Sequence, residues 1–140
     1  MNSGLKMEDN IDQYIPGTRN IGLQEVNIRK KFIWFFLPLT LLFSILCLYY
    51  CHSLLLWFML VASSFSLIVI ILAIKYRFCI LFGFFSLYNF HCLGNLHEVK
   101  SKENIRKDRK RVLEVLLIST VITLTFSTGI HWLAKCLPPL

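Results

Sequence analysis

Long uncharged apolar runs alternate with short polar or charged segments along this chain. The apolar runs cover residues 32–50, 53–74, 78–93 and 112–134, and the last contains one acid, Glu114, near its start. A helix rises about 1.5 Å per residue, so roughly nineteen residues cross the hydrocarbon layer of a bilayer. The pattern therefore predicts an all-α integral membrane protein with four hydrophobic helices, arranged as two antiparallel hairpins.

The first two runs form the clearest pair. A turn of three residues, Cys51-His52-Ser53, joins the two runs, and Ser53 is also the first residue of the second run. Trp34 lies near one end of the first run and Tyr49 near the other, as expected for aromatic side chains at the two membrane interfaces. A connection this short permits only an antiparallel helical hairpin over 32–74.

The third run, 78–93, has sixteen residues and is short for a span. Small or polar residues recur in it at a spacing of three or four, which places them on one face of a helix: Cys79, Gly83, Ser86 and Asn89. Gly83 and Ser86 are the expected helix-packing positions, because small residues let helix backbones approach closely in membranes. A segment that enters and leaves on one side is the alternative to a span.

Polar segments flank and divide the apolar runs. Residues 1–31 form a polar N-terminal tail, which we expect to be mostly flexible and cytosolic. Residues 94–111 are expected to be a basic helical loop continuous with the last run, supported by Glu–Lys pairs four residues apart. Residues 135–140 form a short C-terminal tail, and 32–134 is the membrane domain.

The distribution of positive charge bears on the number of spans. Four spans place seven Lys or Arg residues near the membrane on each side, whereas a third run that does not cross places thirteen on one side and only Lys135 on the other. The positive-inside rule favours the second arrangement. Apolar length favours the first, because 78–96 is just long enough to cross. We expect the four-span arrangement and retain three spans as the alternative.

Composition and charge agree with a membrane location. Hydrophobic residues make up 56% of the chain and charged residues 16%, and the net charge is +7. The positive residues cluster beside apolar runs, which indicates contact with anionic lipid headgroups or a partner and argues against nucleic acid as the ligand. The residues expected to make this contact lie in the basic loop: Lys100, Lys102, Arg106, Lys107, Arg109, Lys110 and Arg111.

Hydroxyl residues in the last run and one cysteine also carry predictions. Thr120, Thr123 and Ser127 are expected to pack against another helix, since interhelical contacts of Ser and Thr are common in membranes. Cys79 follows a basic pair of residues at a membrane edge, so it is a candidate for acylation.

No catalytic motif is present in the sequence, and no pair of acids lies within an apolar run. Cysteines and histidines gather at two membrane edges, but their spacing matches no standard metal site, so we predict no metal and no cofactor. The leading hypothesis is a non-catalytic accessory, assembly or organising subunit of a membrane complex, with a membrane-protein partner or self-association. The alternatives are a membrane-shaping hairpin protein and, third, a small enzyme or metal-binding protein that uses His52, His91 or His97. We expect an endomembrane location, in the endoplasmic reticulum.

Overall fold

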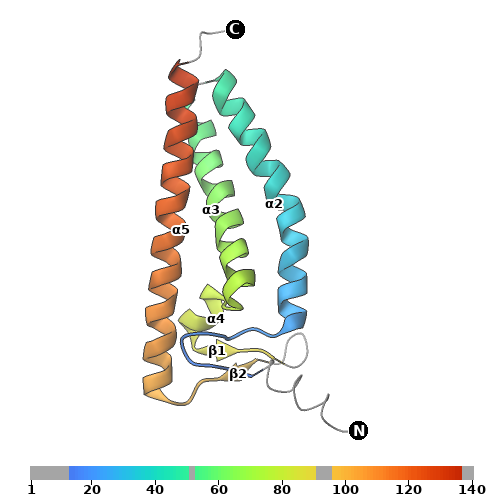
Figure 1. Cartoon of the computed structure of the whole chain (residues 1–140), viewed down its shortest axis with the longest axis vertical. Coiled ribbons are helices and arrows are strands. Elements are labelled where there is room, and N and C mark those ends of the chain that lie inside the picture. The colour runs from blue at the N-terminus through green and yellow to red at the C-terminus, as the bar shows by residue number, and fades with distance from the viewer. Residues whose placement is uncertain (1–12, 51–52, 91–95, 137–140) are drawn as a thin grey trace. The chain divides into compact units, whose positions relative to one another are not determined.

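The computed structural model describes residues 13–50, 53–90 and 96–136, and 78% of these residues are helical. Figure 1 shows the elements in chain order. They are α2 (Leu23–Tyr49), α3 (Leu54–Tyr76), α4 (Ile80–Phe85), β1 (Leu87–Tyr88), β2 (His97–Glu98) and α5 (Lys102–Cys136).

Three of these helices are long and apolar enough to cross a membrane, namely α2, α3 and α5. At about 1.5 Å per residue they are roughly 40, 34 and 52 Å long, against about 30 Å of hydrocarbon. The coarse prediction of an all-α multi-pass membrane protein is therefore supported. The helices also extend beyond the predicted apolar runs: α2 starts nine residues before Phe32 and α5 starts ten residues before Val112.

The prediction of a fourth long helix over 78–93 is not confirmed. This run forms the six-residue helix α4 and then β1, which pairs antiparallel with β2 through Leu87–Glu98 and Tyr88–His97. A helix of six residues is only about 9 Å long and cannot cross a bilayer. Helix α4 ends because Ser86 adopts the left-handed conformation (φ 60°, ψ 41°) and its N–H returns to the Phe82 carbonyl.

The chain divides into two compact units. The basic unit comprises residues 1–30 and 72–115, and the apolar unit comprises 31–71 and 116–140. Among the described residues, twelve of the fourteen Lys and Arg residues belong to the basic unit, since only Lys31 and Lys135 lie in the other. The basic unit contains the start of α2, the end of α3 and the start of α5.

In the apolar unit, most of the buried residues are small and most of the large apolar residues are exposed, although Leu60 and Leu67 are buried. The buried positions on α5 in this unit are Ser119, Thr123 and Ser127, spaced by four, and Ala134, and those on the other two helices include Thr40, Ser44, Ser63 and Ser64. Trp34 and Trp132 are 80% and 70% exposed. This distribution suits helices that pack closely through small side chains and present their large side chains to lipid.

Most of the buried hydroxyls bond within their own helices. Ser44 donates to the Thr40 carbonyl (2.8 Å), Ser64 to Leu60 (2.7 Å) and Ser127 to Thr123 (2.8 Å). Because these groups are satisfied locally, they can be buried without a partner from another helix.

In the basic unit, the segment before α2 is folded. Residues Ile15 and Arg19 close a turn through Pro16 and Gly17, and Ile21 forms a parallel bridge with Asn89. Figure 1 shows this segment running beside β1 and β2. The prediction of a mostly flexible tail is therefore wrong for residues 13–22, while residues 1–12 lie outside the described part of the chain.

Candidate membrane-surface site

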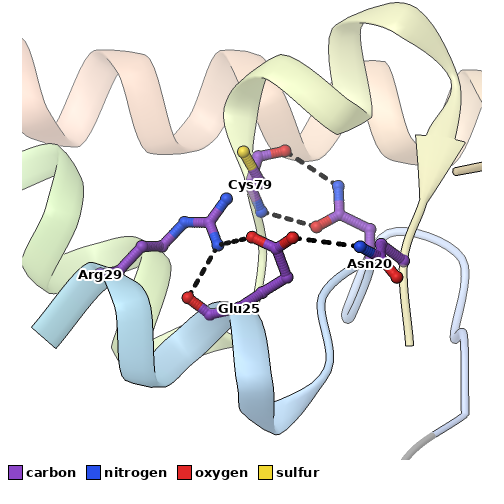
Figure 2. A network of polar contacts seen from close by, with 5 residues as sticks. Asn20, Glu25, Arg29 and Cys79 are labelled. Carbon is purple, nitrogen blue, oxygen red and sulfur yellow. Dashed lines mark hydrogen bonds and ion pairs between the residues drawn. The ribbon is translucent and has the colours of Figure 1, made fainter. Parts of the chain in front are cut away.

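Asn20 fixes the position at which the chain leaves α3 and enters α4. Its side-chain amide donates to the Cys79 carbonyl (2.9 Å), and its Oδ1 accepts the Cys79 N–H (2.6 Å), as Figure 2 shows. The backbone N–H groups of Asn20 and Ile21 both donate to the Arg77 carbonyl. Asn20 is fully buried, so these bonds satisfy a polar group that would be costly to leave unpaired.

A second group of polar contacts joins α2 to the segment after α4. Glu25 Oε1 accepts a hydrogen bond from Asn89 Nδ2 (3.0 Å), and Glu25 Oε2 forms an ion pair with Arg29 (2.8 Å), seen in Figure 2. The Gly22 N–H donates to the Asn89 carbonyl and the Asn89 N–H donates to Asn20. These contacts tie the first turns of α2 to the end of the predicted third run.

Asp108 holds the N-terminal turn against α5. Its Oδ2 accepts the Tyr14 hydroxyl (2.7 Å), and its Oδ1 accepts the Gly17 N–H (2.6 Å). Gly17 has φ +71°, and a Cβ there would lie 3.3 Å from Lys107, so glycine suits both the backbone and the close approach. Asp108 is fully buried. Since it is the only acid among residues 106–112, the outer surface of this part of α5 carries no negative charge.

Burial and the nearby carboxylate together change the acidity of Tyr14. Partial burial raises the pKa of the Tyr14 hydroxyl, and the hydrogen bond to Asp108 and the negative charge of that group raise it further. The phenol therefore remains a donor to Asp108 throughout the physiological range. Tyr14 also stacks on Tyr88 of β1, with ring centroids 4.7 Å apart.

The outer face of α5 carries the cationic stripe, defined as Lys102, Arg106, Arg109 and Lys110. All four residues are exposed and lie opposite the buried position Asp108. Within the part of the chain that the structure describes, none of them forms an ion pair. Lys107 is different, because it pairs with Glu103 at 2.6 Å, and this pair lowers the pKa of Glu103.

Two arginines contact aromatic rings at the edge of the basic unit. The guanidinium of Arg111 lies 4.5 Å from the ring centroid of Tyr76, and Arg111 also pairs with Glu114 (3.0 Å). Arg29 lies 5.8 Å from the ring of Phe82 on α4. The Arg111 contact holds a positive charge beside the end of α3, and the Arg29 contact holds one beside the short helix α4.

The predicted surface cations separate into two groups. Lys100 and the four residues of the cationic stripe are exposed, and Lys107 is exposed within its ion pair. Arg111 instead is half-buried against Tyr76. Of the two Glu–Lys pairs predicted within a helical loop over 94–111, the pair of Glu103 and Lys107 forms. The pair of Glu98 and Lys102 does not lie on one helix, because Glu98 is on β2 and α5 begins at Lys102.

The predicted packing and modification residues have mixed placements. Gly83 is buried beside Phe78 and Val112, and Ser86 is the half-buried residue that caps the C-terminal end of α4. Thr123 and Ser127 are buried, but Thr120 is exposed and bonds to its own helix; Ser119 takes the third buried position.

The thiol of the acylation candidate, Cys79, is in the core of the basic unit. Cys79 is 8% exposed and packs with Ile21 and Val26. Acyl transfer needs an accessible thiolate, so this placement disfavours acylation of the folded protein. The hydrogen bonds from Asn20 to its backbone explain why the residue is held inside.

The histidine candidates are only partly within the described residues. His97 lies on β2 and stacks on Tyr88, with centroids 5.4 Å apart, whereas His52 and His91 lie outside the described residues. Among residues 13–50, 53–90 and 96–136, no three His, Cys, Asp or Glu side chains are grouped so that they could hold a metal ion.

Sequence reasoning missed the residues that organise this site: Tyr14, Asn20, Glu25 and Asp108. One signal was present, since Asp108 is the only acid among seven residues from Arg106 to Val112 and lies four residues before Val112 on the same helical face. Asn20 gave no such signal, because its partners are backbone atoms 59 residues away. No family model matches this chain, and no characterised protein or solved structure is detectably similar to it.

Proposed function

We propose that this protein is a non-catalytic subunit that helps to assemble or organise a membrane complex. Its long helices contact a membrane-protein partner, and its basic unit contacts anionic lipid headgroups at the surface. We expect the protein in an endomembrane, namely the endoplasmic reticulum. The proposal rests mainly on one face of α5 within the apolar unit.

That face combines small residues with open space. Thr125, Thr128 and Gly129 lie on the side of α5 opposite the buried residues Thr123 and Ser127. All three are exposed, and a Cβ added at Gly129 would meet no atom within 4 Å. Both threonine hydroxyls already bond to their own helix, to Val121 and Leu124. A face of this kind lets a second helix approach closely, as small residues four apart do in membranes.

The cationic stripe supports the second part of the proposal. Four uncompensated positive charges on one helical face attract an anionic membrane surface, each contributing about 1 kcal/mol at most near the surface. Asp108 would weaken this attraction if it were exposed, but it is buried under the N-terminal turn. The fold therefore separates the acid from the face that meets the lipid.

The partner claim is tested by filling the small face of α5. The double variant Thr125→Leu, Gly129→Leu is purified from native membranes in mild detergent beside the wild type, and the masses of the intact complexes are measured. We expect the wild type to carry a stoichiometric second subunit or a second copy, and the double variant to lose it. Large side chains at both positions would hold a partner backbone too far away for close packing.

The control is Ile118→Leu, which keeps the size of an exposed side chain on the same helix. It should retain the partner. A wild-type chain that is recovered only as a monomer, with no stoichiometric partner, would contradict the proposal. Retention of the partner by the double variant would exclude this face of α5.

A further inference from the structure

Helix α4 exposes an apolar face although it belongs to the basic unit. Leu81, Phe84 and Phe85 are 65%, 61% and 64% exposed, and their spacing of three and four places them on one side of the helix. The opposite side carries Gly83, which is buried. We call Leu81, Phe84 and Phe85 the α4 apolar face.

Packing within the basic unit fixes the depth of α4. A Cβ built at Gly83 would lie 2.6 Å from Phe78 and 2.8 Å from Val112, so α4 lies directly against Val112. Val112 is the residue at which α5 changes from a run of cations to an apolar sequence. Because α4 touches this transition, it lies at the level where α5 enters the hydrocarbon.

The other two long helices give the same depth. Cys79, immediately before α4, packs with Val26 of α2, and Ile74 of α3 packs against the same cluster. Val26 lies within two turns of the first residue of the apolar run of α2, and Ile74 is the last residue of the apolar run of α3. Helices α3 and α5 therefore change between polar and apolar sequence beside α4, and α2 does so within two turns of its contact with Cys79.

We propose that α4 is an interfacial helix whose apolar face inserts into the lipid leaflet next to the basic unit. The occupant of this face is lipid, in the region between the headgroups and the upper acyl chains, where aromatic side chains are favoured. The charge beside α4 fits this position, since Lys75 precedes α4, is exposed and is suited to anionic headgroups.

The backbone of α4 is compatible with this location. The Gly83 N–H donates to the Cys79 carbonyl, the Ser86 N–H donates to Phe82, and the Ser86 carbonyl accepts the Val99 N–H. These bonds satisfy the C-terminal end of α4, which favours a place at the membrane interface because the hydrocarbon offers few hydrogen-bond partners. The insertion follows from the α4 apolar face and from the packing of α4 within the basic unit, and it does not depend on a protein partner.

Depth-dependent quenching in a lipid nanodisc tests the insertion. The full chain, with its native cysteines replaced by alanine, carries one new cysteine labelled with the environment-sensitive dye NBD. The nanodiscs contain phosphatidylcholine and phosphatidylserine, brominated either high or low on the acyl chain. The test variant is Phe84→Cys, and Leu81→Cys repeats it on the same face. Glu103→Cys is the water control, and Leu117→Cys, on an exposed position in the apolar run of α5, is the hydrocarbon control.

We expect the dye at position 84 to emit as in an apolar medium and to be quenched more by the high bromines than by the low ones. The label at 117 should be quenched in both lipids, and the label at 103 in neither. Emission and quenching at 84 that match position 103 would overturn the proposal. Apolar emission at 84 and 81 without lipid quenching would also overturn it, since protein would then cover the face. The dye reports contact of α4 with lipid, and the masses of the complexes report a partner on α5, so a failure of this proposal and a failure of the proposed function can be told apart.

Discussion

At the scale of single residues, buried polar groups hold the basic unit together. Asp108 joins α5 to the N-terminal turn, Asn20 joins that segment to the start of α4, and Glu25 joins α2 to Asn89. Each of these side chains bonds to a segment far away in the sequence. Removing one leaves buried donors or acceptors unpaired, which costs more than the net contribution of the bond itself.

Asp108→Ala should release the N-terminal turn. The change leaves the Gly17 N–H and the Tyr14 hydroxyl without their acceptor, and we expect a loss of about 2–3 kcal/mol in the stability of the basic unit. Hydrogen exchange of the amides between 14 and 21 should accelerate accordingly. The control Glu103→Ala, at an exposed site, should change exchange little. Equal protection in the two variants would mean that Asp108 does not anchor the turn.

Tyr14 gives the basic unit a pH dependence at the alkaline end. Burial and Asp108 raise its pKa above the ordinary value of 10, so the hydrogen bond is fully present below pH 10 and is lost as the pH rises through the higher folded value. In an ultraviolet titration, the wild type and Tyr14→Phe should therefore show the same tyrosinate absorbance near pH 10. At higher pH the variant should lack the absorbance of one tyrosinate. A signal from Tyr14 that appears at pH 10 would contradict the arrangement.

At the scale of elements, the long helices follow from the sequence and the short ones do not. The uncharged runs predict the apolar parts of α2, α3 and α5 because length and hydropathy decide whether a helix crosses a bilayer. The third run has similar hydropathy, yet it ends as a helix at Phe85. Its backbone is instead paired with distant segments, as Asn89 is with Gly22, and hydropathy carries no information about such pairs.

Gly83→Ala tests the contact that places α4. The new Cβ would lie within 3 Å of the fully buried Phe78 and of Val112, so one of these side chains must move. Overpacking of this kind costs about 1–3 kcal/mol, and the variant should unfold at a lower temperature than the wild type. The control Gly129→Ala meets no atom and should not lower the thermal midpoint. A midpoint unchanged by Gly83→Ala would mean that α4 is not seated on Val112.

At the scale of the whole molecule, connectivity and charge give the same topology. The basic unit contains the start of α2, the end of α3 and the start of α5, so three crossing helices leave all three of these ends on one side. Thirteen Lys and Arg residues near the membrane are then on that side and only Lys135 is on the other, which agrees with the positive-inside rule. The charge count pointed to this arrangement in the sequence, whereas apolar length pointed to four spans.

The central claim is that the chain crosses the membrane three times with its basic unit on one side. Three variants each carry one glycosylation acceptor with a spacer: at the N-terminus, beside Asn104 or after Leu140. Each variant is synthesised in the presence of endoplasmic-reticulum membranes. We expect modification after Leu140 only, because the positive-inside rule predicts that the N-terminus and the basic segment share the cytosolic side. Modification beside Asn104 but neither at the N-terminus nor after Leu140 would show that the third run crosses, and it would contradict the account.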